Sequence, residues 1–294
     1  MKLHGIFVPI ATPFNYDGEV YAAKVEHNVT KWNKTGLAGY IVCAPAGESV
    51  LLSAEERRRM LELAARYAAP DKLLLCGTSA QSVRETVRQI GQATELGYRA
   101  ALVSAPRAYP NLLRNAASQT LFYGAVADQA QIPLILNNSP ATTGVEIAAE
   151  TVARLSAHPN IVAVLEGSGD LEKMARIIAE TKPGFQVLAG AAQTLAGALA
   201  AAAVGAVLDY ANAAPYTAIA IWEAHRMREF DAGADWQRRI ARAAVLVTNR
   251  YGIPGLKYAM DLNGYYGGPV RLPLTTAGPE AKREIEEAFR DLKG

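Results

Sequence analysis

Residues 161–165, Ile161-Val162-Ala163-Val164-Leu165, form an unbroken apolar run that ends at Glu166 and Gly167. Such a run, rich in β-branched side chains, is typical of a strand buried on both faces. Seven similar runs occur in the chain, at residues 6–10, 39–43, 73–76, 100–104, 133–136, 185–188 and 205–208. Segments with helical spacing separate these runs. The alternation predicts a parallel sheet that is covered by helices.

The number of runs indicates how the sheet closes. Eight strand–helix units are the number that closes a (β/α)8 barrel, and an open doubly wound sheet is the alternative. No G-x-G-x-x-G follows the first strand and no P-loop motif occurs in the sequence, so the alternative lacks its main support. We therefore predict an α/β fold, a (β/α)8 TIM barrel with a C-terminal helical extension. Residues 1–294 form a single domain, with the barrel at 1–230 and the extension at 231–294, because no linker rich in Ser, Pro or Gly separates them.

Local signals mark the ends of individual helices. Ser53 followed three residues later by Glu56 is the pattern of a capping box, and it predicts that a helix begins there. Gly97 follows another helical segment and predicts that this segment ends at the glycine.

Composition excludes several function classes. The 294 residues are 50% hydrophobic and carry a formal charge of +2, and no basic run is longer than Arg57–Arg59, so we expect no nucleic-acid partner. Cys43 and Cys76 lie in apolar runs without metal-ligand spacing, which favours a reducing, cytoplasmic location and no bound metal. The longest apolar tract, residues 195–208, is shorter than the roughly 20 residues that cross a bilayer, so no membrane partner is expected. The sequence also builds no phosphate loop, and no cofactor is predicted.

Chemistry in a (β/α)8 barrel is placed at the carboxyl ends of the strands. Asp209 directly follows the last apolar run, where burial would raise its pKa and suit it to general acid or base catalysis. Asn137 can offer a donor and an acceptor to a ligand carbonyl. Arg107 and Tyr109 follow another strand and can clamp a carboxylate. Glu48 is expected to bond backbone groups of its loop.

Several stretches resemble one enzyme family. Gly47-Glu48-Ser49, residues 138–144, residues 159–162 and Gly169-Asp170 are similar to the landmarks of the dihydrodipicolinate synthase and N-acetylneuraminate lyase family of pyruvate-type class I aldolases. Residues 250–257, 260–261 and 264–269 are most similar to its 4-hydroxy-2-oxoglutarate aldolase branch. The resemblance implies a barrel with a helical extension, a homo-oligomer (a tetramer of two dimers, or a dimer), and a pocket for a small 2-oxo acid or related carboxylate. It also implies a lysine at the end of strand six that forms an imine with the substrate.

The sequence departs from this family at the residues that carry the reaction. Leu165 stands where the Schiff-base lysine belongs, and Asn137 stands where the family has a tyrosine that moves protons. The hydroxyl residues of the family fall on Pro45 and Ala46, and its second carboxylate-binding arginine falls on Thr142. Leucine cannot form an imine. The positions predicted to bind the small molecule are Ala46, Gly47, Arg107, Tyr109, Asn137, Thr142, Leu165, Gly190 and Val207.

Three functions remain open at this point. The first is a divergent lyase-like protein that binds a small 2-oxo acid or carboxylate and acts without an imine, through Asp209 and Asn137. The second is a catalytically inactive binding or regulatory protein. The third is a pyruvate-dependent aldolase or synthase that uses a relocated lysine, for which Lys72, Lys173 and Lys257 are the candidates.

Overall fold

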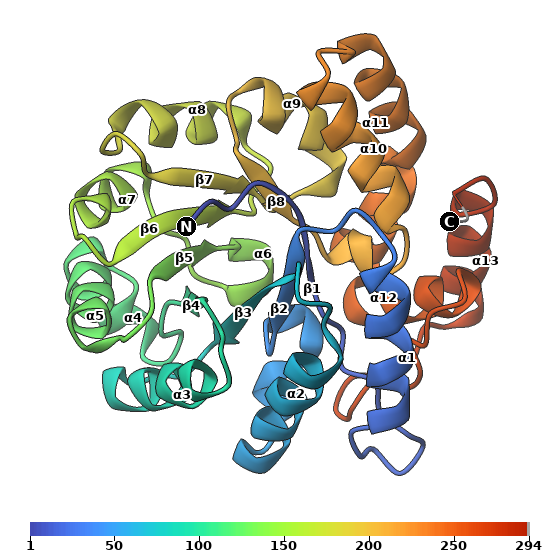
Figure 1. The fold of residues 1–294 in the computed structure, drawn as a ribbon, viewed down its shortest axis with the longest axis horizontal. Helices are drawn as coiled ribbons and strands as arrows, with labels where there is room; N and C mark the ends of the chain where they lie inside the picture. Colours follow the sequence, from blue (N-terminus) through green and yellow to red (C-terminus); the bar gives the residue numbers. More distant parts are fainter. Residues whose placement is uncertain (293–294) are drawn as a thin grey trace.

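Eight parallel strands close into a single barrel (Figure 1). The computed structural model describes residues 1–292. Each strand pairs with the next in sequence, and β1 pairs with β8 to close the ring. The strands are β1 (Gly5–Pro9), β2 (Gly39–Val42), β3 (Leu73–Thr78), β4 (Ala100–Ser104), β5 (Leu134–Asn138), β6 (Ile161–Glu166), β7 (Gln186–Ala189) and β8 (Gly205–Val207). The predicted (β/α)8 barrel is therefore confirmed.

Helices surround the barrel, and α11 to α13 follow it as the predicted C-terminal helices, on the side of α10 and α1 (Figure 1). The α-helices are α1 (Ala22–Asn33), α2 (Ala54–Tyr67), α3 (Val83–Glu95), α4 (Pro110–Leu113), α5 (Ala116–Gln129), α6 (Pro140–Thr143), α7 (Ala149–Ser156), α8 (Leu171–Glu180), α9 (Leu195–Ala200), α10 (Pro215–Arg226), α11 (Phe230–Val245), α12 (Gly252–Leu262) and α13 (Pro279–Ala288). Short 3-10 turns are η1 (Pro45–Gly47), η2 (Ser49–Leu51), η3 (Ala192–Thr194) and η4 (Asp209–Asn212), and η5 (Leu246–Arg250) is a π-helical turn.

The helix ends that the sequence marks are found in the structure. The Ser53 hydroxyl accepts a hydrogen bond from the Glu56 backbone N–H at 3.2 Å, and the Glu56 carboxylate accepts one from the Ser53 N–H at 2.8 Å, so α2 begins with a capping box. Helix α3 ends at Glu95, and Gly97 beyond it has a φ of 83°. Both predictions are confirmed because these signals act through neighbouring residues alone.

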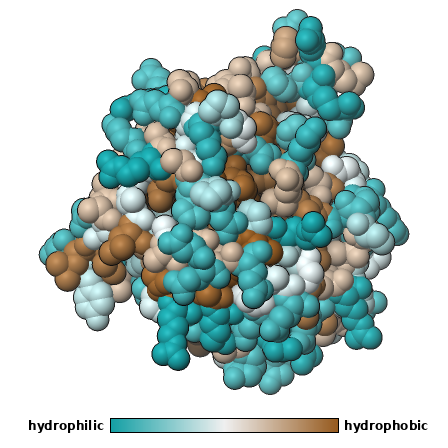
Figure 2. Space-filling model, turned by 60° about the vertical axis from the view of Figure 1, so that its left-hand side comes forward, coloured by the Kyte–Doolittle hydropathy of each residue, from teal (hydrophilic) through white to brown (hydrophobic). Residues whose placement is uncertain are grey.

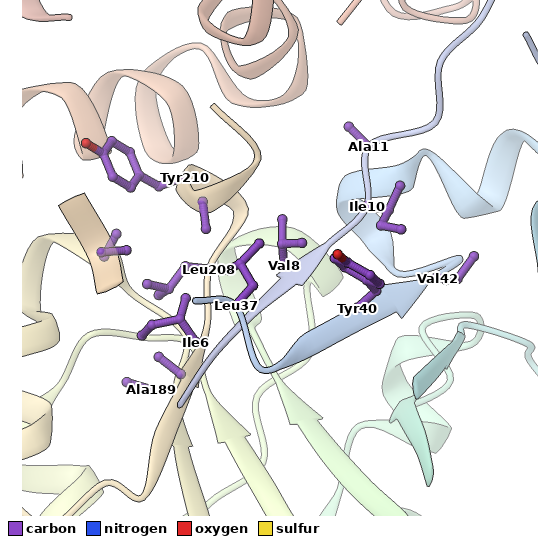
Figure 3. Close-up of a cluster of buried hydrophobic side chains, with 14 of the residues drawn as sticks. Ile6, Val8, Ile10, Ala11, Leu37, Tyr40, Val42, Ala189, Leu208 and Tyr210 are labelled. Carbon is purple, nitrogen blue, oxygen red and sulfur yellow. The ribbon is translucent and has the colours of Figure 1, made fainter. Parts of the chain in front are cut away.

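Two apolar layers lie on the two sides of the barrel wall. Side chains that alternate along each strand point to opposite faces. Ile6 and Val8 of β1 and Tyr40 of β2 face the surrounding helices in the outer layer (Figure 3). Phe7, between Ile6 and Val8, and Ile41, next to Tyr40, point to the other side and fill the barrel interior. The inner layer also contains Leu75, Leu102, Ile135, Ala163, Leu165, Leu188 and Val207. This alternation decides which residues at the carboxyl ends face the barrel axis.

The molecular surface is largely hydrophilic on the face shown in Figure 2, and hydrophobic residues gather in its recesses and at one protruding edge. Within residues 1–292, no helix is both long enough and apolar enough to cross a membrane.

Candidate active site

A cavity of ≈ 70 Å³ lies at the carboxyl ends of the strands. Seven residues that the sequence predicts for the site line it together: Ala46, Asn137, Thr142, Leu165, Gly190, Val207 and Asp209. They come from five parts of the chain, and the closed barrel brings them to one place because the parallel strands all end on the same side.

Asp209 faces this cavity from the start of η4. Leu208 and Tyr210, its neighbours in sequence, pack in the outer layer (Figure 3). The side chain of Asp209 therefore points to the inner side, as does that of Val207. Among residues 1–292, no group donates a hydrogen bond to its carboxylate, and burial alone raises its pKa from 3.8 to about 6. A carboxyl group with this pKa can both accept and return a proton near neutral pH.

A chain of polar side chains forms another part of the wall. Asn137 donates from Nδ2 to the Ser104 hydroxyl at 2.9 Å, and its Oδ1 accepts a hydrogen bond from the Ser139 hydroxyl at 2.8 Å. Ser104 and Asn137 are register partners in β4 and β5, which explains why these side chains meet. The amide of Asn137 is thus held in one orientation, with a second N–H hydrogen available for a ligand.

Leu165 supplies an apolar part of the wall next to these polar groups. It is register partner to Asn137 and to Leu188, and it is 5% exposed. Gly190 packs closely against it, since a Cβ at Gly190 would lie 3.1 Å from Leu165 Cδ1 and 2.7 Å from Gly167 Cα. Glu166, the next residue of β6, lies on the opposite face of the strand and accepts a hydrogen bond from Asn138.

The C-terminal helices contribute residues to the cavity that the sequence did not indicate. Thr248 and Asn249 line it from the π-helical turn η5, and Gln193 lines it from η3. The Thr248 hydroxyl lies 2.7 Å from the carbonyl oxygen of Ala244, at the end of α11, and 2.8 Å from Asn249 Oδ1 in η5, and it donates to these oxygens. Turns of this rare type occur often at functional sites. The sequence contained one signal for these residues, because Thr248 and Asn249 directly precede the family-like stretch that begins at Arg250.

Three predicted binding residues do not line this cavity. Gly47 packs against β1, where its carbonyl accepts a hydrogen bond from Thr12. Arg107 lines a separate cavity of ≈ 200 Å³ beside Glu48, and Thr142 lies between the two cavities. Tyr109 is 72% exposed, with a φ of 50°. Arg107 and Tyr109 therefore do not line the cavity that contains Asp209.

The charge of the cavity is negative. Of the side chains that line it within residues 1–292, Asp209 is the only ionisable one, and none is basic. A carboxylate ligand would enter without a cationic partner, beside a buried carboxylate. The carboxylate ligand that the sequence predicts therefore gains no support from the cavity. In the described part of the chain no group of three or more His, Cys, Asp or Glu residues could hold a metal ion.

The candidate lysines have partners elsewhere. Lys257 is buried, with its Nζ 2.6 Å from Glu48 Oε1 and 2.8 Å from Pro269 O, and burial lowers its pKa despite the attraction of Glu48. Lys173 pairs with Glu146 on the outside of the barrel, at 2.7 Å. Lys72 donates to two backbone carbonyls at the start of β3. None of the three reaches the cavity lining.

Comparison with known proteins identifies the fold and its relatives. The model of the dihydrodipicolinate synthetase family matches residues 2–292. The chain belongs to this family. A 4-hydroxy-tetrahydrodipicolinate synthase of Methanothrix thermoacetophila is 34% identical to this dihydrodipicolinate synthetase family member, over 99% of this chain and 98% of the relative. A probable mitochondrial 4-hydroxy-2-oxoglutarate aldolase of Emericella nidulans is 30% identical, over 98% and 94%.

Solved structures of this family share the fold of the chain. A dihydrodipicolinate synthase from Bacillus anthracis superposes with a TM-score of 0.93 at 24% identity, and the match covers 100% of each chain. The family resemblance predicted from the sequence is confirmed, and it places this chain among lyase-like aldolase folds.

Proposed function

We propose that this protein is a divergent lyase-like member of its family, in which the cavity at the barrel mouth binds a small molecule and Asp209 transfers a proton without an imine. The observation that carries this proposal is the Asp209 carboxylate, which faces the cavity with a pKa raised by burial to about 6. The position at which an imine-forming lysine is expected from the family resemblance is occupied by Leu165, which forms an apolar part of the same wall.

The proton-transfer step follows from the positions of these groups. The ionised carboxylate of Asp209 accepts a proton from the bound molecule and becomes a neutral carboxyl group, while the electron pair stays on the ligand atom. The free N–H of Asn137 can stabilise negative charge that develops on a ligand carbonyl oxygen. Return of the proton from Asp209 to the ligand or its product restores the site.

A relocated imine lysine gains no support from these contacts. Lys72, Lys173 and Lys257 are held by partners outside the cavity, and movement of Lys257 would leave Glu48 as an unpaired buried charge. We therefore favour acid–base chemistry over covalent catalysis.

Proton exchange tests the proposal. A panel of small ketones, amino ketones and 2-oxo acids is incubated with the protein in D2O, and loss of C–H signal is followed by NMR. We expect exchange with at least one compound, with Asp209→Asn slowing it by about 100-fold or more. Asp235→Asn removes an exposed carboxylate paired with Arg238 and should leave the rate unchanged. Equal exchange in wild type and Asp209→Asn, or a borohydride-trapped lysine adduct, would contradict the proposal. Binding without exchange would indicate the inactive binding protein.

We also propose that the chain assembles as a dimer or tetramer. Its family membership supports this, as do the exposed apolar side chains of Tyr109 and Leu112 next to β4. Sedimentation velocity measures the mass directly, and a monomer would refute this assembly.

A further inference from the structure

The cavity carries one formal charge, and that charge is negative. The ionisable side chain among its lining residues is Asp209, and the rest of the lining is apolar or neutral. Within residues 1–292, Asp209 forms no ion pair, and burial is what raises its pKa. Neutral polar groups in the lining include those of Gln193, Thr248 and Asn249. Asp209 is half-buried at the cavity wall, and a cation can stabilise such a carboxylate by replacing the water it has lost.

The hydroxyl groups of the lining reinforce this preference. The Ser139 hydroxyl proton is directed to Asn137 Oδ1, and the Thr248 hydroxyl proton is directed to oxygen atoms of its own turn. Both hydroxyl oxygens therefore offer lone pairs, and not protons, to a ligand. Pro45, at the position of a family hydroxyl residue, has no backbone N–H to offer. At Ser139, Thr248 and Pro45 the wall therefore offers acceptors and no donors, while the second N–H of Asn137 offers a donor.

The remaining wall limits the size and shape of the ligand. Leu102, Leu165 and Val207 form an apolar side of the ≈ 70 Å³ cavity. This side can bury a short hydrocarbon group while the polar end of the molecule lies against Asp209.

From these observations we infer that the cavity selects a small organic cation of the amine or amidine class over the carboxylates that the family resemblance implies. This inference rests on the proposed function, because it assumes that the cavity is a binding site. In the complex, the ammonium or amidinium group pairs with Asp209, and the hydrocarbon part contacts Leu165 and Val207.

Three molecules of nearly the same shape test the inference: acetamidinium, acetamide and acetate, which are cationic, neutral and anionic. The wild-type protein is labelled with 13C in the methyl groups of Leu and Val, and each compound is titrated near neutral pH. The signals of Leu165 and Val207 report binding in the cavity itself. Leu165→Ile and Val207→Ile assign them, because each substitution removes the pair of methyl signals of one residue.

We expect acetamidinium to shift the Leu165 and Val207 signals with a Kd at least about tenfold lower than acetamide, and acetate to bind weakest. Asp209→Asn should abolish the difference between acetamidinium and acetamide, whereas Asp235→Asn should preserve it. Acidification to about pH 5 should weaken acetamidinium binding, because the proton competes with the ligand for Asp209.

Two results overturn the inference in different ways. If acetate or acetamide binds more tightly than acetamidinium, or if Asp209→Asn leaves the preference unchanged, the ligand class is wrong while the cavity remains a binding site. If none of the three compounds shifts the Leu165 and Val207 signals at any concentration the protein tolerates, both the inference and the proposed function fail.

Discussion

Asp209→Asn should stabilise the protein in a pH-dependent way. Burial raises the pKa of Asp209 in the folded state to about 6, from an ordinary value of 3.8. Between these values the folded state binds more protons than the unfolded state. The free energy of unfolding therefore falls as pH rises through this window, and the cost stays in full above about pH 6. The shift is about two units at about 1.4 kcal/mol each, so ionised Asp209 destabilises the fold by about 3 kcal/mol.

The amide cannot ionise, so Asp209→Asn removes this cost. Urea unfolding of wild type and variant is compared at about pH 4 and about pH 8. We expect the variant to gain about 2.5 kcal/mol relative to wild type between the two pH values, because a small part of the cost is already present at about pH 4, whatever the amide itself contributes at both. Asp235→Asn, at an exposed ion pair, should change by less than about 0.5 kcal/mol. If the difference in the free energy of unfolding between Asp209→Asn and wild type is the same at both pH values, the pKa of Asp209 is not raised in the folded state and the reasoning is wrong. A stabilised variant that has lost proton exchange would mark Asp209 as a residue kept for function.

Three further predictions concern other buried groups. Glu48→Gln and Lys257→Met should each lower the free energy of unfolding by about 3–5 kcal/mol, because each leaves a buried charge unpaired. The double variant should lose less stability than the sum of the two single losses. Additive losses in urea unfolding would contradict the pairing of Glu48 with Lys257. Leu165→Lys places an amine in the cavity. Treatment with pyruvate and borohydride should therefore trap a covalent adduct in this variant and not in the wild-type protein, as measured by intact mass. An adduct in the wild-type protein would support a lysine mechanism. Cys43 and Cys76 are buried, and burial raises their pKa values to about 11 and about 12. A thiol reagent should therefore label them only when the protein unfolds. Rapid labelling of the native protein would show that the two thiols are accessible.

The barrel could be predicted from the sequence because each strand is recognisable from its own residues. Each apolar run is short, rich in β-branched residues and followed by a helix, and the predicted runs differ from the observed strands by a few residues at their ends. Alternation of side chains along a strand sets Leu165 and Glu166 on opposite faces of β6. The direction of Asp209 was open in the sequence, and the structure places its side chain in the cavity lining. These signals depend on neighbours in sequence, and the fold preserves them.

Other parts of the site depend on contacts that no local pattern contains. Arg107 and Tyr109 follow β4 directly, but the backbone beyond the strand turns them out of the barrel mouth. Thr248 and Asn249 reach the cavity because a helix after the barrel contains a π-helical turn. The buried ion pair of Glu48 with Lys257 likewise joins segments that are distant in sequence. Such placements follow from tertiary packing, and the sequence alone showed only the residue types.

The contacts of Glu48 have a kinetic consequence for folding. Its carboxylate accepts a hydrogen bond from the backbone N–H of Arg271, 223 residues further along the chain, and the Arg271 guanidinium reaches back to Glu56 and to the carbonyl of Leu51. Closing a loop of this length has a large entropic cost that is recovered only after the intervening barrel has formed. The loop that carries Pro45 and Ala46, and with it one wall of the cavity, should therefore reach its native position late. A partly folded barrel would then contain its strands in order while being unable to bind a ligand.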